Sequence, residues 1–151
     1  MTKLSDDVFN LFKDKIYQES GIHFTVVNRP ILESRIRERL RQHNLDSARD
    51  YYTIINNDSS ELKLLLDCVT TNLTSFFRNE AHFIALKDIV FPEIVKRKTA
   101  QGRKKLKIWS AGCSTGEEPY TIAVLALEHI PMPDSWTIEI LASDISLKSL
   151  L

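Results

Sequence analysis

Apolar residues up to position 70 recur three and four residues apart, the period of a helix with one buried face. The clearest case is Leu32, Ile36 and Leu40, which fall on a single helical stripe. The pattern predicts four helices with short connections, a small bundle. The expected N-terminal caps are Ser5, Asn28, Asp46 or Ser47, and Asp58 with Glu61 as its capping-box partner, and Gly21 is placed to end the first helix.

A different pattern follows a run of small polar residues at 70–75. A helix is expected from Glu80, and Pro92 should kink or restart it near Phe91 because proline removes a helical hydrogen bond. A buried strand, a glycine turn, a helix and a second strand then follow at 106–111, 112–116, 117–130 and 136–143. This order is typical of a βαβ unit with parallel strands. The expected organisation is a helical domain at 1–69, a linker at 70–78 and an α/β domain at 79–151.

Composition narrows the class of protein. The 151 residues are 43% hydrophobic and 26% charged, as in ordinary globular proteins and unlike disordered chains. Lys plus Arg and Asp plus Glu both number 20, so the overall charge favours neither nucleic acid nor a membrane surface. No signal peptide or membrane-spanning run is apparent. Cys68 and Cys113 form no CxxC pair and predict reduced thiols. We therefore expect a cytoplasmic protein without a metal site.

The glycine turn carries most of the chemical signal. Gly112 and Gly116 bound a turn between strand and helix, where backbone can approach a ligand closely. Asp144 follows the second strand, where a carboxylate can accept both hydroxyls of a ribose. Glu117 and Glu118 disfavour phosphate-bearing ligands, although acids also simply stabilise a helix N-terminus. A ligand with a ribose and positive charge, such as S-adenosylmethionine, fits better, and a turn without a ligand stays an alternative.

The same turn matches GxSxG, the nucleophile elbow of α/β-hydrolases, with Ser114 in the nucleophile position. A hydrolase triad would need an acid and then a histidine after this serine. The only later histidine is His129, and no acidic strand end precedes it. The hydrolase interpretation is therefore disfavoured.

Two long motifs resemble the CheR type of chemotaxis receptor methyltransferase. Residues 108–120 read IWSAGCSTGEEPY, similar to one signature of that family, and residues 71–78 read TNLTSFFR, similar to the second at the correct distance upstream. The helical N-terminal half fits as well, so the resemblance covers essentially the whole chain. It implies α + α/β architecture: a small helical bundle followed by the start of a Rossmann-like S-adenosylmethionine-dependent methyltransferase domain, with two parallel strands present.

The resemblance also implies an activity and a site. Such an enzyme methylates glutamate side chains on the cytoplasmic helices of chemoreceptors, using S-adenosylmethionine and releasing S-adenosylhomocysteine. Arg78 is then the residue most like a catalytic one, because its planar fork can bind a carboxylate with two hydrogen bonds. The residues implied in cofactor binding are Asn72, Thr74, Arg78, Ala111, Gly112, Glu117 and Asp144.

Basic residues gather in two places. Residues 29–43 hold five arginines and two glutamates, and at 100° per residue two arginine stripes flank the apolar line. One interpretation is a solvated helix, and the other, favoured by the family, is a basic face that docks an acidic receptor helix. The arginines concerned are Arg35, Arg37, Arg39 and Arg41. Residues 96–107 hold seven basic residues without interleaved aromatics, which we interpret as a solvated connection and not a nucleic-acid site.

Two other functions stay open beside the methyltransferase. One is a non-catalytic cofactor-binding or interaction module of the same fold, and the other is a nucleic-acid methyltransferase, which the motif at 71–78 disfavours. Only two strands are predicted before residue 151, whereas the family's sheet has more, so we expect a fragment or a truncated relative. A sheet of two strands also leaves unpaired edges. A further expectation is therefore association of two copies through that sheet, and no methyl transfer by the 151-residue chain alone.

Overall fold

The computed structural model describes residues 4–151, and these divide into two compact units. The first unit comprises the chain up to residue 71 together with the short segment 145–147, and the second comprises 72–144 and 148–151. Each unit encloses its own cluster of buried apolar side chains. No helix within residues 4–151 has the length and apolar character needed to cross a membrane.

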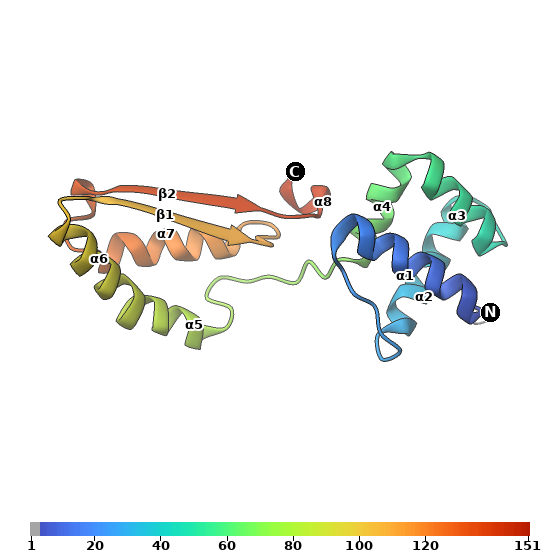
Figure 1. Ribbon diagram of the computed structural model, residues 1–151, viewed down its shortest axis with the longest axis horizontal. Helices are drawn as coiled ribbons and strands as arrows, with labels where there is room; N and C mark the ends of the chain where they lie inside the picture. The colour runs from blue at the N-terminus through green and yellow to red at the C-terminus, as the bar shows by residue number, and fades with distance from the viewer. Residues whose placement is uncertain (1–3) are drawn as a thin grey trace. The chain divides into compact units, whose positions relative to one another are not determined.

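The first unit is a bundle of helices, as predicted (Figure 1). The bounds are α1 Asp6–Ser20, α2 Arg29–Gln42, α3 Ala48–Asn57 and α4 Ser59–Val69. Every helix contributes side chains that are almost completely buried, among them Phe12, Ile16, Leu32, Ile36, Tyr51 and Leu65. The apolar stripe read from the sequence of α2 is therefore the stripe that faces this core.

The ends of these helices confirm some predicted caps and correct others. Gly21 ends α1 in the left-handed region, at φ 73°, which glycine adopts without steric cost. Ser47 and Asp58 accept backbone N–H groups from the first turns of α3 and α4, as expected. Ser5 and Asn28 make no side-chain cap. The Asn28 Oδ1 instead accepts the backbone N–H of the residue three positions earlier, so it closes the preceding loop.

The second unit begins with a helical segment in three parts and continues as the predicted βαβ unit (Figure 1). The helical parts are α5 Glu80–Ala85, the π-helical turn η1 Leu86–Val90 and α6 Phe91–Ala100. They are followed by β1 Lys105–Ala111, α7 Glu117–His129, the 3-10 turn η2 Pro133–Ser135 and β2 Thr137–Ser143. A short helix, α8 Leu147–Leu150, closes the chain.

The π turn explains how the chain accommodates Pro92. The backbone N–H of Phe91 donates to the carbonyl of Leu86, five residues earlier, in place of the usual four. Helix α6 then starts at Phe91 with Pro92 in its first turn, where a missing N–H costs little. The predicted restart near Phe91 is confirmed.

The two strands form a parallel sheet with helices against one face. Pairing runs without a bulge from Lys105 opposite Thr137 to Ala111 opposite Ser143. Figure 1 shows α5, α6 and α7 on the same side of this sheet. The core between them contains Phe91, Leu106, Leu125, Ala126, Ile130 and Trp136.

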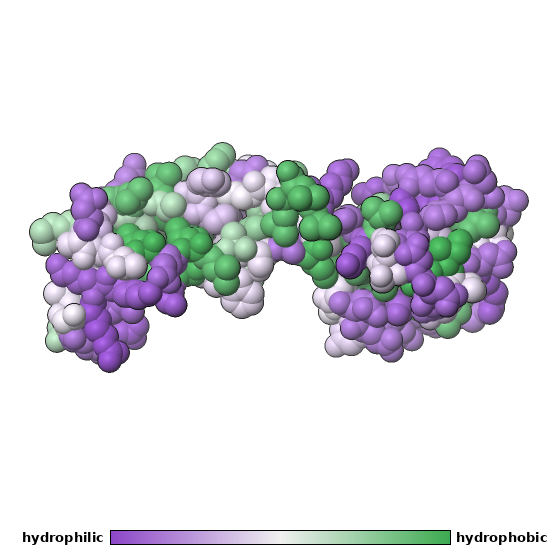
Figure 2. Space-filling view, turned by 90° about the horizontal axis from the view of Figure 1, so that it is seen from above, coloured by the Kyte–Doolittle hydropathy of each residue, from purple (hydrophilic) through white to green (hydrophobic). Residues whose placement is uncertain are grey.

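The other face of the sheet is open to solvent. Trp109 and Leu141, register partners on β1 and β2, are 66% and 65% exposed. Figure 2 shows hydrophobic residues gathered on the visible face of the second unit, whereas the visible face of the first is mostly hydrophilic. The parallel strands bring the ends of β1 and β2 to one edge, where the glycine turn follows β1 and Asp144 follows β2.

Candidate cofactor site in the second unit

The turn between β1 and α7 has an unusual backbone. Gly112, Ser114 and Gly116 all have positive φ, at 83°, 49° and 104°. A Cβ added to Gly112 would meet no heavy atom within 4 Å, so this side of the turn is open space. A ligand can therefore approach the backbone at Gly112 closely, as the sequence predicts for a binding turn.

Asp144 is tied directly to this turn. Its Oδ2 accepts the backbone N–H of Ser114 at 2.7 Å. The carbonyl of Ser143, one residue earlier, accepts the N–H groups of Gly112 at 2.7 Å and Cys113 at 3.0 Å. Three hydrogen bonds thus join the end of β2 to the glycine turn, and they place Gly112 and Asp144, far apart in sequence, at one sheet edge.

The first turn of α7 presents a carboxylate to the same region. Thr115 Oγ1 donates to Glu117 Oε2 at 2.7 Å. This hydrogen bond, with smaller contributions from the backbone and from the Thr74 side chain, holds the pKa of Glu117 below its usual value. Glu117 therefore carries a negative charge at neutral pH, which suits a cationic ligand better than a phosphate.

Both ends of the linker are hydrogen-bonded to the glycine turn or to the helix that follows it. Ser114 Oγ donates to the carbonyl of Asn72 at 3.2 Å, and the N–H of Phe77 donates to Thr121 Oγ1 at 3.2 Å. Together with the Thr74 contact to Glu117, these bonds bring the predicted linker residues to the predicted cofactor turn.

Arg78 is exposed, and its side chain folds back on its own linker. Its Nη1 donates to the carbonyl of Leu73 at 2.5 Å. The residue also lines a pocket of about 360 Å³ together with His82, Phe83 and Glu118. The structure thus places Arg78 next to the helix that begins with the acidic pair, with its guanidinium at the surface.

Three hydroxyl residues hold this site together through contacts that the sequence did not predict. Ser110, 1% exposed, donates its Oγ to Glu118 Oε1 at 2.6 Å and so joins the end of β1 to α7. Ser114 and Thr121 are also buried and hold the linker. A usable signal existed for Thr121, which is a polar residue next to Ile122 on the buried face of α7.

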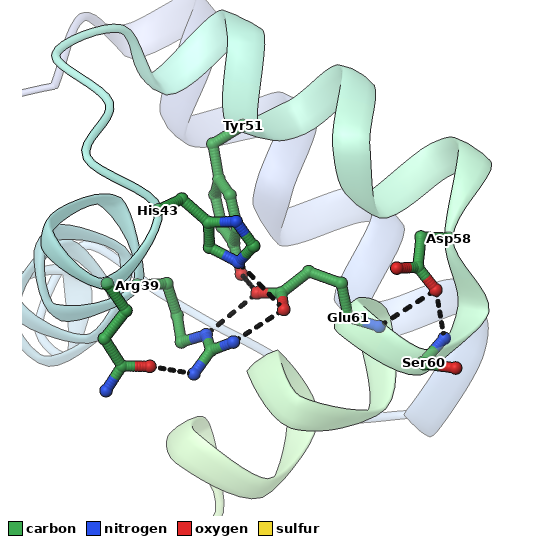
Figure 3. A network of polar contacts seen from close by, with 7 residues as sticks. Arg39, His43, Tyr51, Asp58, Ser60 and Glu61 are labelled. Atoms are coloured by element: carbon green, nitrogen blue, oxygen red, sulfur yellow. Dashed lines mark hydrogen bonds and ion pairs between the residues drawn. The ribbon is translucent and has the colours of Figure 1, made fainter.

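The predicted arginine face on α2 needs one correction. Arg39 is only 8% exposed and belongs to the core of the first unit. Its Nε donates to Glu61 Oε1 at 2.8 Å and its Nη2 to Glu61 Oε2 at 2.6 Å, a two-pronged ion pair (Figure 3). Tyr51 donates its hydroxyl to Glu61 at 2.6 Å, and His43 Nε2 lies 3.0 Å from the same carboxylate. Arg39 is therefore a structural residue and not part of a docking face.

The same network corrects the predicted capping box. Glu61 turns into the core and does not reach back to Asp58. Burial alone would raise the pKa of Glu61, but the hydrogen bonds from Arg39, Tyr51 and His43 outweigh it and hold that pKa below its usual value. Burial and the neighbouring carboxylate raise the pKa of the Tyr51 hydroxyl, which stays protonated and donates.

The other predicted arginines remain on the surface of α2. Arg41 is exposed, and the Arg35 side chain is half-exposed in a 3.4 Å pair with Glu38. Arg37 is partly buried and its Nη1 lies 3.7 Å from a carboxylate oxygen of Glu33, four residues earlier in the helix, an ion pair that supports the helix. Within residues 4–151, no three His, Cys, Asp or Glu side chains come together in a group that could hold a metal ion.

Both units match one protein family. Residues 7–70 match the CheR methyltransferase all-alpha domain, and residues 72–151 match the CheR methyltransferase SAM binding domain. The chain therefore belongs to the CheR methyltransferase family, and the predicted fold class is confirmed.

Particular relatives carry the name chemotaxis protein methyltransferase. Chemotaxis protein methyltransferase 2 of Pseudomonas aeruginosa is 36% identical over 137 residues, covering 91% of this chain and 46% of the relative. The protein of the same name in Vibrio cholerae is 35% identical over 144 residues, 94% of this chain and 49% of the relative. Chemotaxis protein methyltransferase of Salmonella typhimurium is 37% identical over 145 residues, 94% of this chain and 46% of the relative. The chain spans about half the length of these relatives.

Proposed function

We propose that the glycine turn of the second unit binds S-adenosylmethionine and that the protein methylates glutamate side chains of chemotaxis receptors in the cytoplasm. The observation that carries this proposal is the junction of the glycine turn with Asp144 at one sheet edge, through the 2.7 Å bond from Ser114. Membership in the CheR methyltransferase family and the names of the relatives support it.

The residues of the turn fit this cofactor. Open space at Gly112 admits a ligand against the backbone. A carboxylate has about four lone-pair positions, so the bond from Ser114 does not by itself prevent Asp144 from accepting ribose hydroxyls. Glu117, ionised at neutral pH, complements an ammonium or sulfonium group. Ala111, exposed at the end of β1, and the linker residues Asn72 and Thr74 complete the proposed binding residues.

The chemistry would require little from protein side chains. S-adenosylmethionine, when bound, supplies a methyl group on a sulfonium that is already a good leaving group, and transfer to a carboxylate oxygen leaves a methyl ester and S-adenosylhomocysteine. A glutamate with a pKa of about 4.3 is an anionic nucleophile at neutral pH, so no general base is needed. Alignment alone can lower the barrier by roughly 7–11 kcal/mol.

Arg78 is proposed as the residue that aligns the carboxylate. A guanidinium fork binds a carboxylate through two parallel hydrogen bonds, which fixes direction as well as position. In this structure the fork is exposed and holds the carbonyl of Leu73, so it can exchange that neutral acceptor for a charged one. The exchange is favourable because hydrogen bonds to charged groups are stronger than those to neutral groups.

The surface arginines of α2 are proposed to dock the acidic receptor helix. Because Arg39 is buried, the proposed docking face consists of Arg35, Arg37 and Arg41. Their charge would act mainly by attracting and orienting the substrate, because exposed ion pairs add little binding free energy.

Calorimetry with S-adenosylmethionine on the full protein tests the cofactor assignment. Asp144→Asn keeps an oxygen for the N–H of Ser114 but removes the charge, and it should weaken binding at least about tenfold, since bonds to charged groups contribute roughly 1.5–3 kcal/mol. Asp134→Asn, at an exposed position in η2, is the matched control and should bind normally. Equal affinities for the two variants would contradict the ribose assignment.

Transfer of a labelled methyl group to receptor-containing membranes tests the activity. Transfer that depends on added cofactor supports the methyltransferase. Cofactor binding without any transfer would instead support the non-catalytic binding module.

A further inference from the structure

Thr121 is a fully buried polar side chain on α7 whose hydroxyl makes two hydrogen bonds. It donates to the carbonyl of Glu117 at 2.6 Å, one turn earlier in the helix. It also accepts the backbone N–H of Phe77 from the linker at 3.2 Å. A single oxygen thus connects the first residue of α7 with the residue that precedes Arg78.

The backbone on both sides of Arg78 is left-handed. Phe77 has φ 55° and Asn79 has φ 60°. Asparagine enters this region readily, whereas a bulky residue such as phenylalanine seldom does. Such conformations persist only where the surroundings hold them. Beside the hydroxyl of Thr121, other local contacts hold this segment. The ring of Phe77 lies edge-on against Phe83 at 6.1 Å, and Arg78 donates its backbone N–H to the carbonyl of Ser75 at 3.3 Å and its Nη1 to the carbonyl of Leu73 at 2.5 Å. The carbonyl of Asn79 accepts the N–H of His82 at 2.8 Å.

A second hydroxyl holds the other end of the linker. Ser114, 7% exposed and itself left-handed at φ 49°, donates its Oγ to the carbonyl of Asn72 at 3.2 Å. Its N–H is the group that Asp144 accepts. The linker from 72 to 78 is therefore fastened at both ends to the turn and helix that form the cofactor site.

We propose that Thr121 is a positioning residue for Arg78. By holding the N–H of Phe77, its hydroxyl fixes the left-handed turn from which Arg78 projects, and by holding the carbonyl of Glu117 it fixes that turn relative to the proposed cofactor carboxylate. This inference rests on the proposed function, because Arg78 matters for reaction only if the protein transfers a methyl group to a carboxylate.

Three variants of the full protein test the hydroxyl itself. Thr121→Val keeps the shape and removes the oxygen, and Thr121→Ser keeps the oxygen. Thr53→Val is the control for loss of a helical hydroxyl bond, because the Thr53 hydroxyl also donates to the carbonyl four residues earlier, that of Arg49, and Thr53 belongs to the first unit. Fluorescence of Trp136, buried in the second core, reports whether the unit that holds Thr121 and the linker is folded in each variant.

Amide hydrogen exchange in the peptide that contains Phe77 measures the hold on the linker without needing substrate or cofactor. Thr121→Val should speed this exchange by about two- to tenfold, the equilibrium change that one net hydrogen bond represents. Thr121→Ser and Thr53→Val should leave it unchanged. Unchanged exchange in folded Thr121→Val would overturn the proposal, whether or not the protein proves to be a methyltransferase.

Kinetics then test the connection to Arg78. Thr121→Val should lower kcat by about ten- to a hundredfold, as small misplacements of aligning groups do, with KM for the cofactor nearly constant. In an Arg78→Lys background, Thr121→Val should lower kcat much less, because Arg78→Lys has already removed the alignment that Thr121 supports. If the double variant instead loses the product of the two single losses in kcat, the two residues act independently and the proposal is overturned. Absence of methyl transfer in the unmodified protein would refute the proposed function and leave the exchange result to decide on the linker.

Discussion

Replacement of Arg39 by alanine is expected to destabilise the helical unit by about 3–5 kcal/mol, because it leaves the carboxylate of Glu61 buried without its charge partner. Arg39 supplies two of the hydrogen bonds that Glu61 accepts, at 2.8 and 2.6 Å, and both side chains are below a tenth exposed. The hydroxyl of Tyr51 and His43 would remain and cannot replace a guanidinium. Since whole domains are stable by about 5–15 kcal/mol, the loss would be a large share.

Hydrogen exchange by mass spectrometry measures this loss in the 151-residue chain, because peptides from α4 report on the first unit separately. Arg35→Ala is the matched control: its pair with Glu38 is longer, at 3.4 Å, and both partners are over 40% exposed. Exposed pairs of this kind contribute at most about 1 kcal/mol. If Arg39→Ala costs no more than Arg35→Ala, the ion pair with Glu61 is not the structural element described above.

The same carboxylate makes the helical unit sensitive to acid. The pKa of Glu61 is lowered in the folded chain, so its contribution is fully present above the unfolded value of about 4.3 and is lost as the pH falls through the lower folded value. Compared with the unmodified chain, the Glu61→Gln variant should have a smaller free energy of unfolding at neutral pH, and this free energy should change less with pH in the acid range. Parallel pH curves for the two proteins would contradict this assignment.

In the full protein, Arg78→Lys should cause a marked loss of methyl transfer with a smaller loss of cofactor affinity, because lysine keeps the charge but not the fork. Normal turnover on receptor membranes would make Arg78 merely structural. The double substitution Arg35→Ala and Arg41→Ala should weaken receptor methylation by the full protein, most at low salt, where the Debye length is about 30 Å. The affinity for the cofactor, measured by calorimetry, should not change. An equal effect on cofactor binding would refute the docking role. Gly112→Ala should lower the free energy of unfolding by about 1–2 kcal/mol through backbone strain alone, since no heavy atom lies within 4 Å of the new methyl group. It should also weaken cofactor binding. Unfolding experiments measure the first effect and calorimetry the second, and an unaltered affinity would place the ligand elsewhere. The 151-residue chain should self-associate through the sheet edge and the open face at Trp109, which light scattering would show. It should also lack methyl transfer in an activity assay. An active monomer would contradict both expectations.

Local signals in the sequence were enough for most of the fold. The predicted strands at 106–111 and 136–143 differ from the observed ones by a single residue, and the restart at Phe91 follows from Pro92 alone. These features depend on periodicity and on glycine and proline, which act within a few residues. The glycine turn and Asp144 could be paired from the sequence because parallel strands bring their ends to one edge.

The parts that could not be predicted depend on contacts between distant residues. Four arginines alternate along α2, and only the position of Glu61, 22 residues beyond Arg39, determines which of them is buried. Thr121 meets the N–H of Phe77 across 44 residues, a pairing that no local pattern encodes. The predicted cap at Asn28 was also wrong. Its side chain accepts the N–H of Thr25 in the preceding loop and does not cap the helix that follows.

The π turn at Leu86–Val90 limits how the chain length can change during evolution. Phe83 and Leu86 on the N-terminal side and Ile94 and Val95 on the C-terminal side all pack on the same core. The π turn between the two pairs holds one residue more than an α-helical turn, and this extra residue brings both pairs to the same face. Deleting one residue there would restore α-helical pairing and rotate one set by about 100° relative to the other, away from the sheet. Insertions and deletions among homologues should therefore avoid 86–90 and accumulate in the connections at 101–104 and 131–135, between core residues.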